Sequence, residues 1–210
     1  MKLSAPYVKC LFRTRFRQVW LKQKYIPGRT SRTLYFLNHS SWWDGLIPFL
    51  LNRYLFRQHA RFMMQDRQMN HYRYFRRAGA FSVNLDTPAG SFKPLRYALE
   101  SMKRDCASLY VFPEGKITPF TTAKPCFRNG LPWLCRQLPG VDTVPVGIYI
   151  HSMCHSRPEL HIQIGDPVDL QKSSMTLEKS KNRLEVSLQM QLADLRKYGG
   201  FENTYFEKWL

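Results

Sequence analysis

Short apolar runs alternate with longer segments of helical periodicity after Pro27-Gly28, and this alternation limits the fold more than any other feature. The expected strands are 33–38, 60–64, 81–85, 108–112, 143–150 and 159–164, and the expected helices are about 41–57, 67–77, 91–104, 128–138 and 176–197. Repeated strand-then-helix order is typical of a single layered α/β domain, with a mixed, largely parallel sheet flanked by helices. In such sheets, chemistry gathers at the carboxyl ends of the strands.

The first 27 residues are expected to form an N-terminal unit ahead of the domain at 28–210. Residues 6–25 place their large apolar side chains within about half of a helical wheel, with basic side chains opposite. These apolar residues are Val8, Leu11, Phe12, Phe16, Val19 and Trp20. The pattern predicts a basic amphipathic helix whose aromatic side chains enter a lipid surface while Lys and Arg meet anionic headgroups. A helix packed on the domain is the alternative.

Positive charge is concentrated in the first third of the chain. The formal net charge is +17, and residues 1–77 hold 16 Lys or Arg against two acidic residues, Asp44 and Asp66. Such a field attracts polyanions, which include nucleic acid, an anionic bilayer and acidic substrates such as coenzyme A thioesters. Charge alone does not choose among these partners.

The expected location is the cytoplasmic face of a membrane, as a peripheral protein of unknown oligomeric state. No apolar run approaches the ~18 to 20 residues that cross a bilayer, and the N-terminus lacks the apolar region of a signal peptide. The chain has five Cys without paired spacing. An odd, unpaired set is typical of reduced thiols.

A nucleic-acid-binding module is the main rival from another class. The chain is strongly basic, and residues 71–77 (HYRYFRR) interleave basic and aromatic side chains. Lys and Arg contact phosphates, and exposed aromatic rings stack on bases. The sequence nevertheless contains no zinc finger or RNA-recognition signature, so we expect no nucleic-acid partner.

The segment from Asn38 to Asp44 joins an apolar strand to an apolar helix, which is the position of an active-site loop. In a continuous helix, His39 and Asp44 would point about 140° apart and could not share a proton. If Ser40 or Ser41 caps the helix instead, Asp44 can reach back to the imidazole. A carboxylate on one ring nitrogen lets the other act as a general base. The alternative is a loop histidine without catalytic role, in a lipid-binding or scaffold protein.

Two further blocks end or contain apolar strands. Residues 111–118 (VFPEGKIT) would present the carboxylate of a Pro-Glu-Gly turn at the same sheet edge as His39, although an ordinary turn also fits. Residues 143–147 (TVPVG) form a strand with Pro145 inside it. Since proline donates no ladder hydrogen bond, this strand is expected at an edge or in an irregular position.

Read in order, these blocks resemble those of the glycerolipid acyltransferase family, which includes the enzymes that acylate lysophosphatidic acid. The resemblance spans about residues 33–167, where Gly-Asp-Pro at 165–167 is similar to a late family turn. Several blocks in the right order and separation are far more specific than one. The blocks are Asn-His-x4-Asp at 38–44, Phe-Pro-Glu-Gly at 112–115, Phe-Arg-Asn-Gly at 127–130 and Val-Pro-Val-Gly at 144–147.

The resemblance implies transfer of an acyl group from a thioester, acyl-CoA or acyl carrier protein, to a lipid hydroxyl. The default acceptor is a lysophospholipid such as 1-acylglycerol-3-phosphate. His39 would deprotonate the acceptor hydroxyl, and Asp44 would orient His39, without a covalent acyl-enzyme. No metal or prosthetic cofactor is implied. The residues that the resemblance assigns to acceptor binding are Glu114, Gly115, Lys116 and Thr118.

The chain departs from the family pattern at two positions where the family has an arginine for the acceptor phosphate. Leu85 and Ile117 stand at these positions, and neither side chain can donate the paired hydrogen bonds of a guanidinium. Lys116, or Lys93 with Arg96, could supply the charge from a shifted position. Alternatively, the acceptor is a hydroxylated lipid without phosphate, such as a glycolipid or a carotenoid derivative.

A group of histidines and a cysteine near residues 151–161 raises the question of a metal site. His151 and His155 are expected between two strands, so their spacing does not bring them onto one face, and Cys154 belongs to no CxxC pair. With His161 further on, the group is interpreted as a solvated hairpin loop rather than a metal site.

Overall fold

All eight strands of the described residues belong to one mixed sheet in this computed structural model, which describes residues 4–84, 88–120, 124–153, 155–170, 175–201 and 203–210. The strand order is β4-β3-β5-β2-β6-β7-β1-β8. Six strands lie where the sequence predicts them, and β1 and β8 are additional. The strands are β1 (Gln18–Gln23), β2 (Thr33–Leu37), β3 (His59–Gln65), β4 (Ala80–Val83), β5 (Ala107–Val111), β6 (Asp142–His151), β7 (Glu159–Ile164) and β8 (Glu207–Lys208).

The five neighbouring strands β4, β3, β5, β2 and β6 run parallel. β7 is antiparallel to β6 and parallel to β1, and β8 is antiparallel to β1. The predicted α/β class, with a mixed and largely parallel sheet, is therefore confirmed. Because five strands share one direction, their carboxyl ends lie along one edge of the sheet, where loops can gather reactive side chains.

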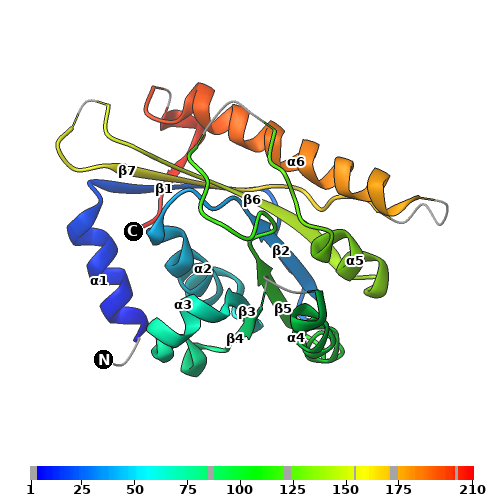
Figure 1. Ribbon diagram of the computed structural model, residues 1–210. Coiled ribbons are helices and arrows are strands. Elements are labelled where there is room, and N and C mark those ends of the chain that lie inside the picture. The colour runs from blue at the N-terminus through cyan, green and yellow to red at the C-terminus, as the bar shows by residue number, and fades with distance from the viewer. Residues whose placement is uncertain (1–3, 85–87, 121–123, 154, 171–174, 202) are drawn as a thin grey trace.

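Helices cover both faces of the sheet, and α6 lies along β6 (Figure 1). One face carries α1 (Ala5–Arg15), α2 (Ile47–Leu51) and α3 (Asp66–His71), and the other carries α4 (Pro88–Ser101), α5 (Gly130–Gln137) and α6 (Leu177–Tyr198). Shorter helical turns are η1 (Trp42–Leu46), η2 (Asn52–Phe56), η3 (Arg73–Ala78) and η4 (Asn203–Tyr205).

The sheet separates two buried apolar clusters. β2 is buried along its whole length because helices cover both of its faces. Leu34 and Phe36 belong to the cluster under α4, α5 and α6, while Tyr35 and Leu37 belong to the cluster under α1 and α2. Alternate side chains point to opposite faces of a strand, so a strand buried on both sides reads as a continuous apolar run.

The N-terminal helix is shorter than predicted. It ends at Arg15, and residues 18–23 form β1, which pairs with β7 from Gln18 opposite Glu159 to Gln23 opposite Ile164. The prediction of a helix to residue 25 was wrong. Val19 and Trp20 fit the apolar side of a helical wheel, but Val19 and Leu21 also share the buried face of a strand. Pairing with β7 and β8, which no local pattern reveals, selects the strand.

The apolar face of α1, together with the turn after this helix, packs against the rest of the domain. Val8 and Phe12 are fully buried and Phe16 is nearly so, and both phenylalanine rings meet the edge of Trp43, with centroids 5.6 and 5.3 Å away. These side chains cannot enter a lipid surface without leaving the core, which corrects that expectation in favour of a packed helix. Among the described residues, no helix is both long and apolar enough to cross a bilayer.

β6 is an interior strand, so of the two positions expected for Pro145 the edge strand is wrong and the irregular position is right. Pro145 lies opposite Phe36 of β2, but the ladder with β7 begins one residue later, at Val146. The carbonyl of Pro145 instead accepts a hydrogen bond from Gly165 N–H. The proline therefore occupies the end of a ladder, where a missing donor costs nothing.

Candidate active site

The loop after β2 is anchored by Asn38. Its side-chain amide donates from Nδ2 to the carbonyl of Ile148 at 2.9 Å, and its Oδ1 accepts from Ile148 N–H at 2.7 Å. The side chain thus continues the ladder between β2 and β6 as a peptide group would, after β2 itself has ended. This two-point attachment fixes the direction in which the chain leaves the sheet and presents His39.

Asp44 holds the turn of the loop with an entirely buried carboxylate. Ser41 is the N-cap of η1 and Asp44 is its third residue. Oδ2 accepts hydrogen bonds from the backbone N–H groups of Ser40 and Ser41 at 2.6 and 2.7 Å, and Oδ1 accepts from the Ser41 hydroxyl at 2.7 Å. Buried carboxylates need such donors. Of the two caps considered in the sequence, Ser40 and Ser41, the structure has Ser41, with His39 ahead of it.

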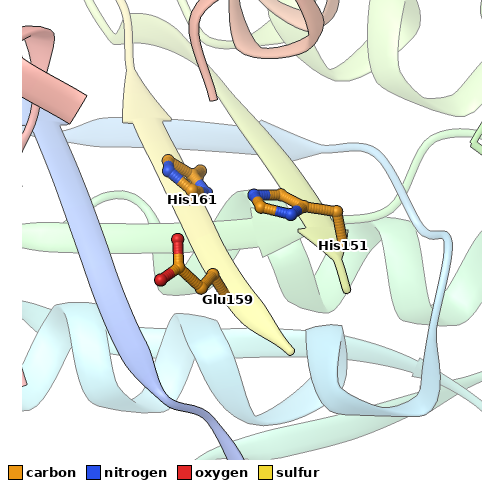
Figure 2. A group of neighbouring side chains, drawn as sticks. All are labelled: His151, Glu159 and His161. Atoms are coloured by element: carbon orange, nitrogen blue, oxygen red, sulfur yellow. The ribbon is translucent and has the colours of Figure 1, made fainter. Parts of the chain in front are cut away.

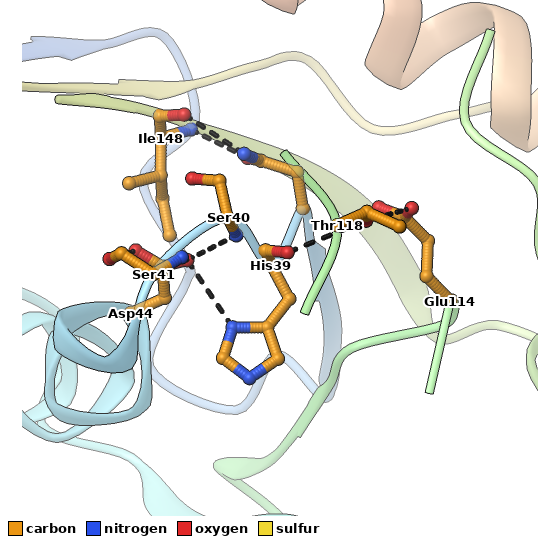
Figure 3. A network of polar contacts seen from close by, with 8 residues as sticks. His39, Ser40, Ser41, Asp44, Glu114, Thr118 and Ile148 are labelled. Carbon is orange, nitrogen blue, oxygen red and sulfur yellow. Dashed lines mark hydrogen bonds and ion pairs between the residues drawn. The ribbon is translucent and has the colours of Figure 1, made fainter. Parts of the chain in front are cut away.

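The same carboxylate contacts the imidazole, as Figure 3 shows. Nδ1 of His39 lies 3.3 Å from Oδ2 of Asp44. The ring also stacks on Phe112 at the end of β5, with centroids 4.4 Å apart. These two contacts orient the ring and direct Nδ1 to Asp44, which leaves Nε2 for other chemistry.

The segment that begins with the Pro-Glu-Gly turn follows the neighbouring strand β5 and is hydrogen-bonded to this loop. Thr118 N–H donates to the carbonyl of His39 at 2.8 Å, and the Thr118 hydroxyl donates to the carboxylate of Glu114. Gly115 has a φ of 70°, in the left-handed region that glycine adopts without strain. The sheet order places β5 beside β2, so the predicted meeting of the two loops at one edge is confirmed.

We expect Asn38→Ala to destabilise the fold by about 1–3 kcal/mol, because the buried N–H and C=O groups of Ile148 would both lose their partner. Chemical denaturation of wild type and variant measures the change. Asn182→Ala, on the exposed side of α6, is a matched control that should leave the unfolding free energy nearly unchanged. Equal stability of all three proteins would contradict the anchoring role.

A cavity of about 660 Å³ opens beside His39 at the carboxyl ends of β5, β3 and β4. Its walls are mostly apolar, and two of the four residues predicted to bind the acceptor, Gly115 and Lys116, line it. Glu114 and Thr118 are not among its lining residues, and their observed contacts are with each other and with the His39 loop. Apolar lining residues include Phe62, Met64, Phe75, Phe127, Leu131 and Leu134.

Among the described residues, three cationic side chains line the cavity: Lys116, Arg128 and Lys181. Ile117, which stands where the family has arginine, also lines it and is 49% exposed. Lys93 and Arg96 are exposed on α4 and are not among the lining residues, so of the two substitutes considered from sequence Lys116 has the better position. Leu85 lies outside the described residues.

Aromatic residues of 71–77 belong to the packed interior rather than to an open stacking surface. Phe75 is buried, and Tyr72 is half-buried against the edge of Trp42. Both line the cavity. Tyr110, another lining residue, is not a competing base because burial raises its pKa well above the ordinary value and keeps the phenol protonated.

Four residues of the site received no individual role from the sequence. Asn38 and Phe112 were visible within motifs, but their contacts depend on which strands are neighbours. Arg128 belongs to the Phe-Arg-Asn-Gly block at 127–130, to which the sequence assigns no function. Lys181 comes from α6, whose helical pattern shows no sign that one lysine reaches the cavity.

The fold and the site together define an α/β protein in which a histidine–aspartate pair opens onto an apolar cavity. The profile of the Acyltransferase family matches residues 18–155, more than half of the chain. The chain belongs to the Acyltransferase family and is an acyl-transferring enzyme.

Among solved structures, the chain is similar to the 1-acyl-sn-glycerophosphate (LPA) acyltransferase PlsC from Thermotoga maritima. The TM-score is 0.65 at 20% identity, over 91% of this chain and 78% of that one. At this identity the likeness shows a shared fold. No curated protein matches the sequence significantly.

Proposed function

We propose that the protein transfers a fatty acyl group from an acyl thioester to the hydroxyl of a lipid, by default a lysophospholipid such as 1-acylglycerol-3-phosphate. The observation that carries this proposal is the position of His39, held by Asp44 through Nδ1 and lining an apolar cavity large enough for a fatty chain. The similar fold of PlsC, which is named for this activity, supports it.

His39 acts as the general base in this proposal. Nε2 accepts the proton of the acceptor hydroxyl while the oxygen attacks the thioester carbonyl carbon. The carbon–sulfur bond then breaks, and the imidazolium returns the proton to the departing thiolate, so the products are an ester and a thiol. Asp44 stabilises the imidazolium that forms between these two steps. No covalent acyl-enzyme is required.

The donor is acyl-CoA or an acylated carrier protein, and both are anionic. The concentration of basic residues in the first third of the chain favours their approach and that of an anionic lipid surface. We therefore place the protein at the periphery of a membrane, on the cytoplasmic face where such donors occur. Because the apolar face of α1 is buried, this attachment relies on surface charge and on exposed rings such as Tyr7 and Trp42.

Lys116 and Arg128 are the proposed ligands of the acceptor phosphate. Both line the cavity with His39, and a phosphate monoester placed there would balance their charge. Lys116 directly precedes Ile117, so the cation is displaced by one residue from the family position.

An acceptor panel tests the function. We expect acyl-CoA to be consumed with 1-acylglycerol-3-phosphate, and Lys116→Ala to raise KM for this acceptor about tenfold while changing KM for a monoacylglycerol little. Lys103→Ala, an exposed lysine paired with Glu100, is the matched control. Thiol release and lipid mass spectrometry measure both substrates. Failure of every hydroxylated lipid to become acylated would refute the proposed function.

The second candidate is the same transfer to an uncharged hydroxylated lipid, such as a glycolipid or a carotenoid derivative. Ile117 favours it, since an apolar side chain lines the cavity where the family pattern has a guanidinium. In the same panel, this candidate predicts preference for the uncharged acceptor and an unchanged KM in Lys116→Ala.

A further inference from the structure

A second group of reactive side chains lies on the hairpin of β6 and β7. His151 and Glu159 are directly opposite each other in the antiparallel ladder, and His161 follows two residues after Glu159. Side chains on one face of a sheet repeat every two residues, so all three point to the same face. Figure 2 shows the His151 ring reaching across from β6 toward His161 on β7, with the Glu159 carboxylate beside it.

The three side chains converge at distances that suit a metal ion. One ligand atom from each lies within 4.8 Å of the others. Ligand nitrogens around tetrahedral Zn²⁺ are about 3.4 Å apart, given Zn–N bonds of about 2.0–2.1 Å. The observed and required spacings differ by roughly 1.4 Å at most. Small rotations of the side chains would therefore bring the three ligand atoms to the spacing that zinc requires. The sequence interpretation considered His151, Cys154, His155 and His161 but not Glu159, which the register of β6 and β7 places opposite His151.

The imidazole of His151 lacks hydrogen bonds from the described residues. Both of its ring nitrogens are buried without a hydrogen-bond partner. Such groups usually mark a missing water or ion. Burial lowers the pKa of His151, and the charge of Glu159 acts in the opposite direction. Gly200 allows this close packing, because a Cβ there would lie 2.6 Å from Cε1 of His151.

Glu159 supplies a negative charge to the group. Burial opposes its ionisation, but hydrogen bonds from Arg17 and Trp20 outweigh burial and lower its pKa. Oε1 accepts from Arg17 at 2.6 Å, and Oε2 accepts from Trp20 Nε1 at 3.2 Å. Arg17 is a competing cation, yet its side chain is 46% exposed and can turn to solvent when a divalent ion binds. A cavity of about 100 Å³ beside the group gives access and room for a water ligand.

We propose that His151, Glu159 and His161 form a binding site for a divalent transition metal, with Zn²⁺ the best fit to two imidazoles and one carboxylate. The fourth position is left for water or for His155, which lines the same small cavity. The metal would tie β6 to β7 on the face covered by α6. Its role is structural, since His39 and its cavity lie elsewhere on the molecule.

Zinc titration of the purified, metal-free chain tests this site. We expect one equivalent of Zn²⁺ to bind and to raise Tm, and His151→Gln to lower the affinity at least about tenfold. Arg17→Gln should bind Zn²⁺ more tightly, since it frees Glu159 from a competing cation. His59→Gln, at an exposed position on β3, is the matched control and should bind as wild type does.

Cobalt substitution provides an independent readout on the wild-type protein, which does not depend on whether a variant folds. Co²⁺ should give visible ligand-field bands without the intense near-ultraviolet bands of thiolate ligation, since the proposed ligands are nitrogen and oxygen. The site is overturned if wild type binds no Zn²⁺ above background, if His151→Gln binds it equally well, or if the Co²⁺ spectrum shows thiolate bands. If Arg17→Gln binds Zn²⁺ with unchanged or weaker affinity, Glu159 is not a metal ligand.

Discussion

His39→Ala is expected to lower kcat for acyl transfer about a thousandfold or more, because the acceptor hydroxyl would lose its base. KM for the thioester should change little, since the apolar walls of the cavity remain. Steady-state release of the thiol in the presence of a saturating acceptor measures both constants. A kcat within a few-fold of wild type would show that another group takes the proton.

His59→Ala is the matched control for this experiment. His59 is also a histidine next to a strand boundary, but it is the exposed first residue of β3, away from the carboxyl edge that carries the cavity. We expect its kcat to equal that of wild type. Thermal unfolding of both variants confirms that a loss of rate in His39→Ala does not arise from a loss of folded protein.

Asp44→Asn is expected to lower kcat by about a thousandfold and also to destabilise the fold by about 2–4 kcal/mol. From the sequence alone, this substitution is predicted to preserve the fold. The structure changes that prediction because the buried carboxylate accepts three hydrogen bonds from Ser40 and Ser41 besides its contact with His39. The side-chain amide of Asp44→Asn would place an NH₂ group, itself a donor, against these donors.

Asp142→Asn separates the two effects. Asp142 also accepts a hydroxyl hydrogen bond, from Tyr25 at 2.7 Å, but it lies at the opposite end of the sheet, where β6 begins. We expect a loss of stability without a loss of kcat. Rates are compared at a temperature where every variant stays folded. If Asp44→Asn keeps the wild-type kcat under that condition, the carboxylate has a structural role alone.

The class of fold and the position of the reactive pair follow from local patterns in the sequence. Apolar runs identify six strands because each is long enough to be buried on one or both faces. The sequence makes the pairing of His39 with Asp44 conditional on a helix cap at Ser40 or Ser41, and the resemblance to the acyltransferase family favours it. Local patterns of this kind act over a few residues, and the sequence displays them directly.

Features that depend on strand neighbours could not be predicted in this way. Residues 18–23 fit a helical wheel, and only their pairing with β7 makes them a strand. Glu159 joins His151 and His161 because β6 and β7 form an antiparallel pair in one particular register. Lys181 reaches the cavity from a helix about 140 residues after His39. Each contact joins distant segments, and a single sequence contains no direct signal of such pairing.

The most direct test of the central claim is intact-protein mass spectrometry combined with thiol release, with acyl-CoA supplied first alone and then with a lysophospholipid. Direct attack by an acceptor activated at His39 predicts an unmodified protein and only background thiol without acceptor. Adding the acceptor should give equal amounts of thiol and acylated lipid. A protein mass increased by one acyl group, or thiol release that ignores the acceptor, would contradict the account.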